Sequence, residues 1–326
     1  MVSSYFLSQK LKLLVKNKIL IIGLNGQDGK LLYEFYKSKK NTNIIGIDKK
    51  FIYYFEKKLK KKFNYLNEIN IKKLIKLKFN KIFFLAAINQ SSQNMDEHSS
   101  NYIKRSIHTN FLYYSNILSF VKEFSPKSKV IYATSSLIYS DKYVKVSENS
   151  EKDAKSIYSI TKLSSYYLGK FYRDNLNIYV TNLILFNHDS HYRKDDFLIK
   201  KILNSAYANY KGSSKKYVFF NKNTKIDISL AKVFINYFHQ ISNLRKPDDF
   251  ILSSGKSYTI EQIIKNIYKN FNLNYQNHVI FKKKILPRKR AHIVGDNSKL
   301  KKYIKYYDLS LNQICSSLTK DYIDQF

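Results

Sequence analysis

Tyr158 and Lys162 form a Y-x-x-x-K pattern, a spacing that could move a proton during the oxidation of an alcohol. Side chains four residues apart in a helix lie on one face, so both would point to the same place. A nearby ammonium stabilises a tyrosinate and lowers the pKa of the phenol, which can then exchange a proton with a sugar hydroxyl. Ser135 and Ser136 end the preceding predicted strand, where a hydroxyl can hydrogen-bond the reacting oxygen. We therefore predict Ser135, Tyr158 and Lys162 as catalytic residues and Ser136 as a substrate-binding residue.

A glycine loop stands between the apolar run 18–22 and a helical pattern that follows at once. Its glycines have G-x-x-G-x-x-G spacing, and the whole chain has only 8 Gly. A strand that enters a glycine turn and opens a helix is typical of a dinucleotide site. Glycine lets the backbone approach the pyrophosphate, and the helix N-terminus supplies free N–H groups. The predicted cofactor-binding residues of this loop are Gly23, Gly26, Gln27, Asp28 and Gly29.

Asp48 ends the next predicted strand, 19 residues after Gly29. A carboxylate at this point accepts hydrogen bonds from the adenosine ribose and repels a 2′-phosphate, which favours NAD. Lys49 follows directly and could instead pair with the 2′-phosphate of NADP. We predict both Asp48 and Lys49 as cofactor-binding residues, with NAD favoured over NADP.

Strands alternate with helices through the first half of the chain, which predicts a parallel sheet. The predicted strands are 19–22, 43–47, 81–85, 129–132 and 178–185, and the predicted helices are 30–40, 71–77, 110–123 and 158–174. This pattern predicts an α/β fold of the Rossmann type, a doubly wound parallel sheet with a smaller mixed α/β substrate-binding region.

The pattern loosens after Phe186, where short strands mix with helices. The predicted organisation is an N-terminal extension over 1–17, an NAD(P)-binding Rossmann domain over 18–185, and a mainly substrate-binding region over 186–326. Some segments of that last region are expected to return to the sheet.

The chain carries a net charge of +34 over 326 residues. Lysines are spread through nearly every segment, so compositional bias explains the charge better than a specific nucleic-acid site does. The charge would still attract an anionic substrate. No apolar run approaches the roughly 18–20 residues of a membrane span, and no His, Cys, Asp or Glu cluster has metal-ligand spacing. The single cysteine, Cys315, is expected to lie on a helix that faces the protein core, and a single cysteine suits the reducing cytoplasm.

The order of glycine loop, serine strand and Y-x-x-x-K resembles the extended short-chain dehydrogenase/reductase (NAD-dependent epimerase/dehydratase) family. The segments 23–29 and 185–190, Gly-Leu-Asn-Gly-Gln-Asp-Gly and Leu-Phe-Asn-His-Asp-Ser, resemble its GDP-mannose 4,6-dehydratase branch most closely. The helix around Asn110 and Asn116 also matches that branch.

The resemblance implies a GDP-mannose or related GDP-sugar substrate, a bound NAD or NADP, and a homo-oligomer, either a dimer or a tetramer. It adds cofactor contacts at the end of the third strand and from the two catalytic side chains, and substrate phosphate contacts from later residues. The implied cofactor residues are Leu85, Ala86, Ala87, Tyr158 and Lys162, and the implied substrate residues are Asn187, Arg193, Lys200 and Arg288.

One departure from the branch concerns the chemistry directly. The branch has a glutamate where this chain has Leu137, and leucine can neither remove the C5 proton nor assist loss of the C6 hydroxyl. A dehydratase would then need another acid, for which Asp189 and Glu148 are the nearest in sequence. The chain also lacks the branch's arginine next to Asp227.

Four hypotheses follow from these residues. The first is an enzyme that acts on a GDP-sugar and descends from the 4,6-dehydratases. The second keeps only C4 oxidoreduction or epimerisation through Ser135, Tyr158 and Lys162. The third is a non-catalytic, cofactor-binding relic that serves as an interaction protein, because Tyr113 and Ser140 replace frequent glycines. The fourth, nucleic-acid binding through charge alone, has no recognition motif to support it.

Overall fold

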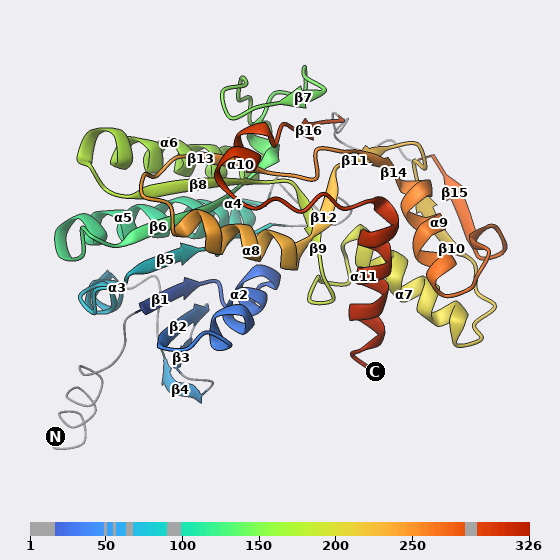
Figure 1. Cartoon of the computed structure of the whole chain (residues 1–326), viewed down its shortest axis with the longest axis horizontal. Coiled ribbons are helices and arrows are strands. Elements are labelled where there is room, and N and C mark those ends of the chain that lie inside the picture. Colours follow the sequence, from blue (N-terminus) through green and yellow to red (C-terminus); the bar gives the residue numbers. More distant parts are fainter. Residues whose placement is uncertain (1–16, 49–50, 55–56, 63–67, 90–98, 284–291) are drawn as a thin grey trace.

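A computed structural model describes residues 17–48, 51–54, 57–62, 68–89, 99–283 and 292–326. Its centre is an eight-stranded sheet in the order β13-β8-β6-β5-β1-β2-β3-β4 (Figure 1). Six strands are mutually parallel and confirm the predicted doubly wound sheet: β1 (Asn17–Ile22), β2 (Thr42–Asp48), β5 (Lys81–Phe84), β6 (Lys129–Ser135), β8 (Val180–Leu185) and β13 (Asp249–Leu252). Two antiparallel strands, β3 (Phe51–Tyr54) and β4 (Lys57–Lys62), extend the sheet beyond β2.

Helices cover both faces of this sheet, because successive residues of a buried strand point to opposite sides. Leu20 and Ile22 of β1 join one apolar core, and Ile19 and Ile21 join the other. The first core is closed by α3 (Glu68–Ile75), α5 (Tyr113–Phe124) and α6 (Ile157–Leu176). The second is closed by α2 (Gln27–Lys37), α8 (Ala231–Ser242) and α10 (Ser298–Tyr303).

A separate apolar core holds the helices that lie beyond the carboxyl ends of the parallel strands (Figure 1). It contains α7 (Leu198–Tyr210), α9 (Ile260–Asn270) and α11 (Leu311–Ile323) with the paired strands β10 (Tyr217–Phe220) and β15 (Val279–Lys282). Cys315 is fully buried in this core, as its helical spacing predicts.

Short elements connect these parts. They are β7 (Lys145–Val146), β9 (Asn187–Asp189), β11 (Lys225–Ile226), β12 (Ile228–Leu230), β14 (Tyr258–Thr259) and β16 (Val294–Gly295), with the helix α4 (Ser100–Ser106). β9 continues the chain directly after β8 and pairs in parallel with β12, so the end of β8 is linked to the smaller core.

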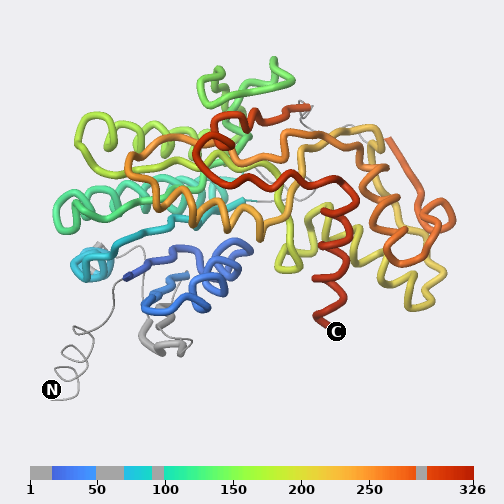
Figure 2. The backbone as a smooth tube through the Cα atoms, in the orientation of Figure 1, coloured from blue at the N-terminus to red at the C-terminus, as the bar shows by residue number. Residues whose placement is uncertain are grey.

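The chain returns to the sheet after residue 186, as Figure 2 lets the reader trace in yellow and orange. Strand β13 lies in the looser second half of the chain and pairs in parallel with β8 at the sheet edge, as expected of a segment that returns to the sheet. The division of the chain near residue 185 stays a prediction, and the extension over 1–17 lies outside the described residues apart from Asn17.

Two helices begin at places that differ from the prediction. Helix α2 starts at Gln27 and not at Lys30, because extended Gly26 is its N-cap and Lys30 N donates to Gly26 O at 3.0 Å. The glycine loop therefore opens directly into the helix N-terminus. The predicted helix over 110–123 begins as a π-helix over Ile107–Leu112 and becomes α5 at Tyr113.

Candidate active site

The glycine loop at the N-terminus of α2 has three positions without a side chain. Gly23 has a φ of +96°, and a Cβ there would stand 2.7 Å from Ala86 N. A Cβ at Gly29 would collide with the carbonyl oxygens of Gly23 and Leu24. Only Gly23 O at 3.3 Å comes near a Cβ placed on Gly26. Two glycines are thus required by packing, and the third keeps the loop free of a side chain, an arrangement that fits the pyrophosphate of NAD or NADP.

Two strand ends lie beside this loop. Asp48 Oδ2 accepts a hydrogen bond from Asn25 N at 2.9 Å, so the end of β2 is tied to the loop. Leu85 N donates to Ile22 O at 2.9 Å, which places 85–87 at the end of β5 next to the glycines. The predicted cofactor residues of three segments therefore meet at one edge of the sheet. Lys49 lies outside the described residues.

Ser135 and Tyr158 meet at the end of β6. Ser135 accepts a hydrogen bond from Leu137 N at 3.2 Å through its Oγ, and it also hydrogen-bonds Tyr158. Tyr158 stands in the first turn of α6, which Ser156 and Ser159 start with a reciprocal capping box. Ser136 is half-buried at the start of a short 3-10 turn. Burial raises the pKa of the Tyr158 phenol to about 12, although the Ser135 hydrogen bond and Arg193 both lower it.

Lys162 lies on the same helix, one turn further, and is fully buried. Its Nζ donates to Ala133 O at 2.7 Å and stands 4.8 Å from the centre of the Tyr132 ring. Burial lowers the pKa of Lys162 to about 7, while the charge of Asp28 raises it. The expected lowering of the Tyr158 pKa by a full ammonium charge is therefore wrong for this structure, because the ammonium is itself desolvated.

Asn110 is the residue at this site whose role the sequence did not reveal. It is buried inside the π-helix, where its Oδ1 accepts from Ile88 N at 2.8 Å and its Nδ2 donates to Thr161 Oγ1 at 3.0 Å. Ser165 Oγ donates to Asn110 O at 2.7 Å. The asparagine thus ties the chain after β5 to the helix that carries Tyr158 and Lys162. A π-bulge has no sequence signal that could have predicted this.

Gln27 and Asp28 contact residues 188–190, at and directly after β9. Gln27 Nε2 donates to His188 O at 3.0 Å, and Ser190 Oγ donates to Gln27 Oε1 at 3.1 Å. His188 Nε2 lies 3.0 Å from Asp28 Oδ2. Their assignment as cofactor residues stays a prediction, and these contacts join the loop to the segment that was assigned to the substrate.

Arg193, a predicted substrate residue, interacts electrostatically with Tyr158. Its guanidinium stacks 3.8 Å from the centre of the Phe197 ring, its Nε lies 3.2 Å from Asp189 Oδ1, and its charge lowers the pKa of Tyr158. Asn187 is exposed, and its Nδ2 donates to Asp227 O at 3.0 Å.

Lys200 has other partners. Its Nζ donates to His191 O at 2.9 Å and lies 4.6 Å from the centre of the Tyr322 ring on α11. The structure gives it no contact with the serine and tyrosine of the site. Arg288 lies outside the described residues.

The two sequence candidates for a replacement acid differ in their surroundings. Glu148 Oε1 accepts from Ile251 N at 2.9 Å, so its carboxylate is held on the edge strand β13. Asp189 is buried beside Arg193, and burial raises its pKa while Arg193 and His188 lower it. Leu137 is 40% exposed.

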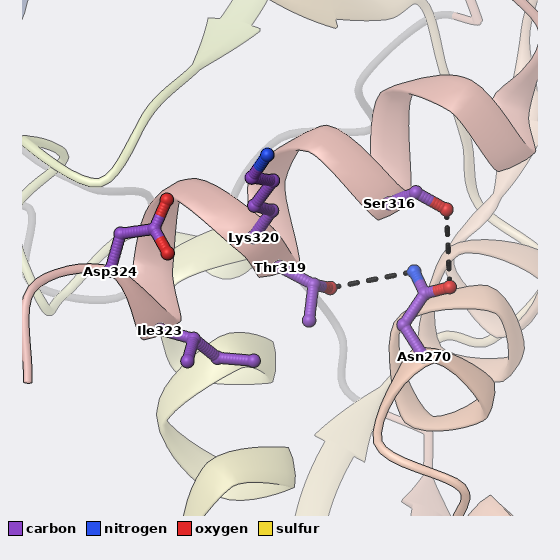
Figure 3. A pocket seen from close by; sticks show the side chains of 6 residues that line it. All are labelled: Asn270, Ser316, Thr319, Lys320, Ile323 and Asp324. Carbon is purple, nitrogen blue, oxygen red and sulfur yellow. Dashed lines mark hydrogen bonds between the residues drawn. The ribbon is translucent and has the colours of Figure 1, made fainter.

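A surface cavity of about 290 Å³ lies elsewhere, between α9 and α11 (Figure 3). Asn270 there hydrogen-bonds Ser316 and Thr319, which joins the two helices. The cavity is lined by Asn270, Ser316, Thr319, Lys320, Ile323 and Asp324. None of these is a predicted site residue.

In the described part of the chain, no helix is long and apolar enough to cross a membrane. The same residues contain no group of three or more His, Cys, Asp or Glu side chains that could hold a metal ion.

Two solved structures illustrate the likeness of this fold to known proteins. The structure of RMD from Pseudomonas aeruginosa complexed with NADPH has a TM-score of 0.77 at 13% identity and covers 95% of this chain and 100% of its own. The dTDP-glucose 4,6-dehydratase from Bacillus anthracis in complex with NAD has a TM-score of 0.76 at 14% identity, over 94% and 97%. At these identities the likeness shows the fold, which is the Rossmann-type α/β fold of an extended parallel sheet with a smaller second region.

The sequence comparison identifies the family. The family model for GDP-mannose 4,6-dehydratase matches residues 20–316, so the chain belongs to the GDP-mannose 4,6-dehydratase family. The enzyme from Dictyostelium discoideum is 24% identical over 78% of this chain and 76% of its own length. GDP-mannose 4,6-dehydratase 1 from Arabidopsis thaliana is 26% identical over 48% of this chain, a match that spans only 44% of that protein.

Proposed function

We propose that this protein acts on a GDP-hexose, with GDP-mannose as the first candidate, and oxidises its C4 hydroxyl as the opening step of a 4,6-dehydration. The observation that supports this most is the meeting of Ser135 and Tyr158 at the end of β6, with Arg193 close enough to lower the Tyr158 pKa. The glycine loop ends at the same edge of the sheet. Bound NAD or NADP supplies a hydride acceptor and donor.

Each residue has a distinct task in this proposal. Tyr158 takes the proton of the sugar hydroxyl in oxidation and returns it in reduction, and Ser135 holds the reacting oxygen by a hydrogen bond. Lys162 is proposed to keep α6 against β6 through its hydrogen bond to Ala133 O. Arg193 is proposed to hold the substrate phosphates.

The dehydration step needs an acid that Leu137 cannot supply. Of the two candidates, we infer that Asp189 serves, since its neighbour Arg193 also influences Tyr158, whereas Glu148 is bonded to the edge strand. Burial raises the Asp189 pKa, which favours a protonated carboxyl. Simple C4 reduction or epimerisation without dehydration is the alternative if no acid reaches the C6 hydroxyl.

The cofactor preference is proposed from Asp48. Its carboxylate is bound through one oxygen to the loop amide of Asn25, next to the place where an adenosine ribose belongs in this fold. We propose that the ribose 2′-hydroxyl is recognised there, which favours NAD over NADP. Comparison of the two dissociation constants tests this directly.

A homo-oligomer is proposed from an apolar stripe on α6. Ile160, Tyr167 and Phe171 are each about half exposed, at 46, 53 and 51%, and stand on one helical face. Ile107 and Leu112 of the adjacent π-helix are also exposed. Such a patch on paired helices suits burial against a second copy of the chain. A cytoplasmic location is proposed from the single buried cysteine, which needs no oxidising compartment.

Incubation of the purified protein with GDP-mannose and catalytic NAD or NADP tests the proposal. We expect a product lighter by one water, without net reduction of the cofactor. Stoichiometric reduction of the cofactor would support the simple oxidoreductase. Cofactor binding without any turnover of GDP-sugars would contradict the proposal and support the relic.

A further inference from the structure

The segment 188–192 binds along helix α2, although about 160 residues of chain separate the two. Gln27 exchanges hydrogen bonds with His188 O and with Ser190 Oγ. Further along the helix, Tyr192 OH donates to Glu34, and Lys30 Nζ lies 4.8 Å from the centre of the Tyr192 ring. We call these contacts the α2 clasp. The clasp joins the glycine loop to the segment that ends in Arg193.

The centre of the clasp is the pair of Asp28 and His188. Nε2 of the ring lies 3.0 and 3.1 Å from the two carboxylate oxygens, and Nδ1 lies 2.7 Å from Phe186 O. A carbonyl and a carboxylate only accept hydrogen bonds, so both ring nitrogens have to donate. The geometry therefore requires the doubly protonated imidazolium.

The surroundings of the ring agree with that charge. The ring of Phe234 on α8 stacks on His188 at 4.7 Å. Burial lowers the His188 pKa and Arg193 lowers it further, but Asp28 and the Phe186 carbonyl outweigh them and raise the pKa overall. Burial raises the Asp28 pKa, and His188 and Arg193 outweigh it and lower it overall. Asp189, in the same segment, also interacts with His188. An ion pair is thus the stable form near neutral pH.

Asp28 connects this pair to the proposed catalytic residues. Its charge raises the pKa of Tyr158 and of Lys162, whereas Arg193 lowers the pKa of Tyr158. Loss of the His188 proton would leave Asp28 uncompensated beside the glycine loop, where a pyrophosphate would bring further negative charge. It would also release the segment that carries Arg193.

We propose that protonated His188, held by Asp28, is a positioning residue that couples the cofactor loop to the nucleotide-sugar segment, so that a dinucleotide and a guanosine diphosphate each strengthen binding of the other. The substrate half of this inference rests on the proposed function. The coupling is present below the pKa of His188 and lost as the pH rises through it, because the neutral ring can donate to only one of its two acceptors.

Isothermal titration of the full chain tests the inference with NAD and GDP as probes. For the wild type at pH 6.5, saturation with NAD is expected to tighten GDP about fivefold or more, within the usual range of coupling between sites. His188→Asn and the isosteric Asp28→Asn should both reduce this factor to about 1. His239→Asn is the matched control, since that histidine of α8 contacts Tyr36 and takes no part in the clasp.

A second measurement does not depend on the sugar. The dissociation constant of NAD should rise about fivefold between pH 6 and pH 9 in the wild type and in His239→Asn. It should change less in His188→Asn. A His188→Asn protein that melts as a folded domain and keeps the wild-type pH profile would overturn the inference. A wild type that shows the His188-dependent profile but binds no GDP would instead overturn the proposed substrate and leave the His188–Asp28 assignment standing.

Discussion

The Oγ of Ser135 accepts a hydrogen bond from the backbone amide of Leu137 at 3.2 Å. This contact fixes the backbone of residue 137 two positions from the serine that also hydrogen-bonds Tyr158. The Leu137 side chain is 40% exposed, so a polar chain of similar length can replace it without displacing the core. Position 137 therefore remains a suitable place for an acid even though this chain has none there.

Leu137→Glu is expected to increase the yield of dehydrated product from GDP-mannose by about tenfold or more, a modest fraction of what a positioned acid or base contributes. Leu137→Gln has the same shape without the carboxyl and should not produce the increase. Product mass after a fixed time gives the measurement. An equal gain in both variants would assign the effect to polarity and contradict general acid–base chemistry at this position.

Tyr158→Phe is expected to slow hydride transfer by about 100-fold or more while NAD binding stays within about twofold. Burial raises the Tyr158 pKa to about 12, so the tyrosinate fraction rises about tenfold with each pH unit below that value. Oxidation by the wild type should therefore accelerate from pH 6 to pH 9. Single-turnover formation of reduced nicotinamide measures this, and a pH slope that survives in Tyr158→Phe would exclude the tyrosine as the base.

Lys162→Met should change how stability depends on pH. Burial lowers the pKa of Lys162 in the folded state to about 7, from the ordinary 10.5. Between these two pH values the unfolded chain therefore binds more protons than the folded chain. The free energy of unfolding should then rise with pH, by about 2 kcal/mol from pH 7 to pH 9 on account of this lysine. Urea unfolding at both pH values should show a smaller rise for Lys162→Met. Lys81→Met is a useful second variant, since burial also lowers the Lys81 pKa, to about 8.

Asp227→Asn is expected to destabilise the fold by about 2 kcal/mol. The NH₂ group of the asparagine would face backbone N–H groups that now donate to the carboxylate, and two donors cannot hydrogen-bond each other. Its carboxylate accepts from Ser254 N at 2.8 Å, Ser254 Oγ at 2.7 Å, Gly255 N at 3.2 Å and Gly295 N at 3.3 Å. Burial raises its pKa to about 6, so the folded state binds more protons between about pH 4 and 6. Stability should fall as the pH rises through that window and then level off.

Chemical denaturation at pH 5 and pH 7 checks this prediction. Asp308→Asn is the exposed control, and we expect it to lose less than about 0.5 kcal/mol. An Asp227→Asn protein as stable as the control at pH 7 would show that the four donors find other acceptors.

Tyr167→Glu together with Phe171→Glu is expected to dissociate a homo-oligomer, because two charges would enter the buried part of the α6 stripe. Both residues are about half exposed in the single chain, so the folded subunit should remain intact. Sedimentation velocity gives the oligomeric state, and circular dichroism gives the fold. Exchange of the exposed Tyr210 for Glu serves as a control on α7. A wild type that sediments as a monomer would refute the interface at once.

Local patterns in the sequence were enough to predict the architecture and to select most of the candidate site residues. Alternating apolar strands and helices predicted the parallel sheet, since a buried strand and an amphipathic helix each produce a short-range pattern of apolar residues in the sequence. The three glycines predicted the loop. The structure explains Gly23 and Gly29, because a Cβ at either position would collide with neighbouring backbone atoms. The Y-x-x-x-K spacing correctly placed Tyr158 and Lys162 on one helix.

Tertiary structure alone decided what those residues contact and which charges they carry. Lys162 donates a hydrogen bond to Ala133 O, and burial lowers its pKa to about 7, because desolvation depends on everything packed around the side chain. Asn110 joined the chain after β5 to α6 through a π-helix, and Asp28 met a histidine 160 positions later. Partners so distant in the chain follow no local pattern, so the sequence could propose catalytic residues but not the network of contacts around them.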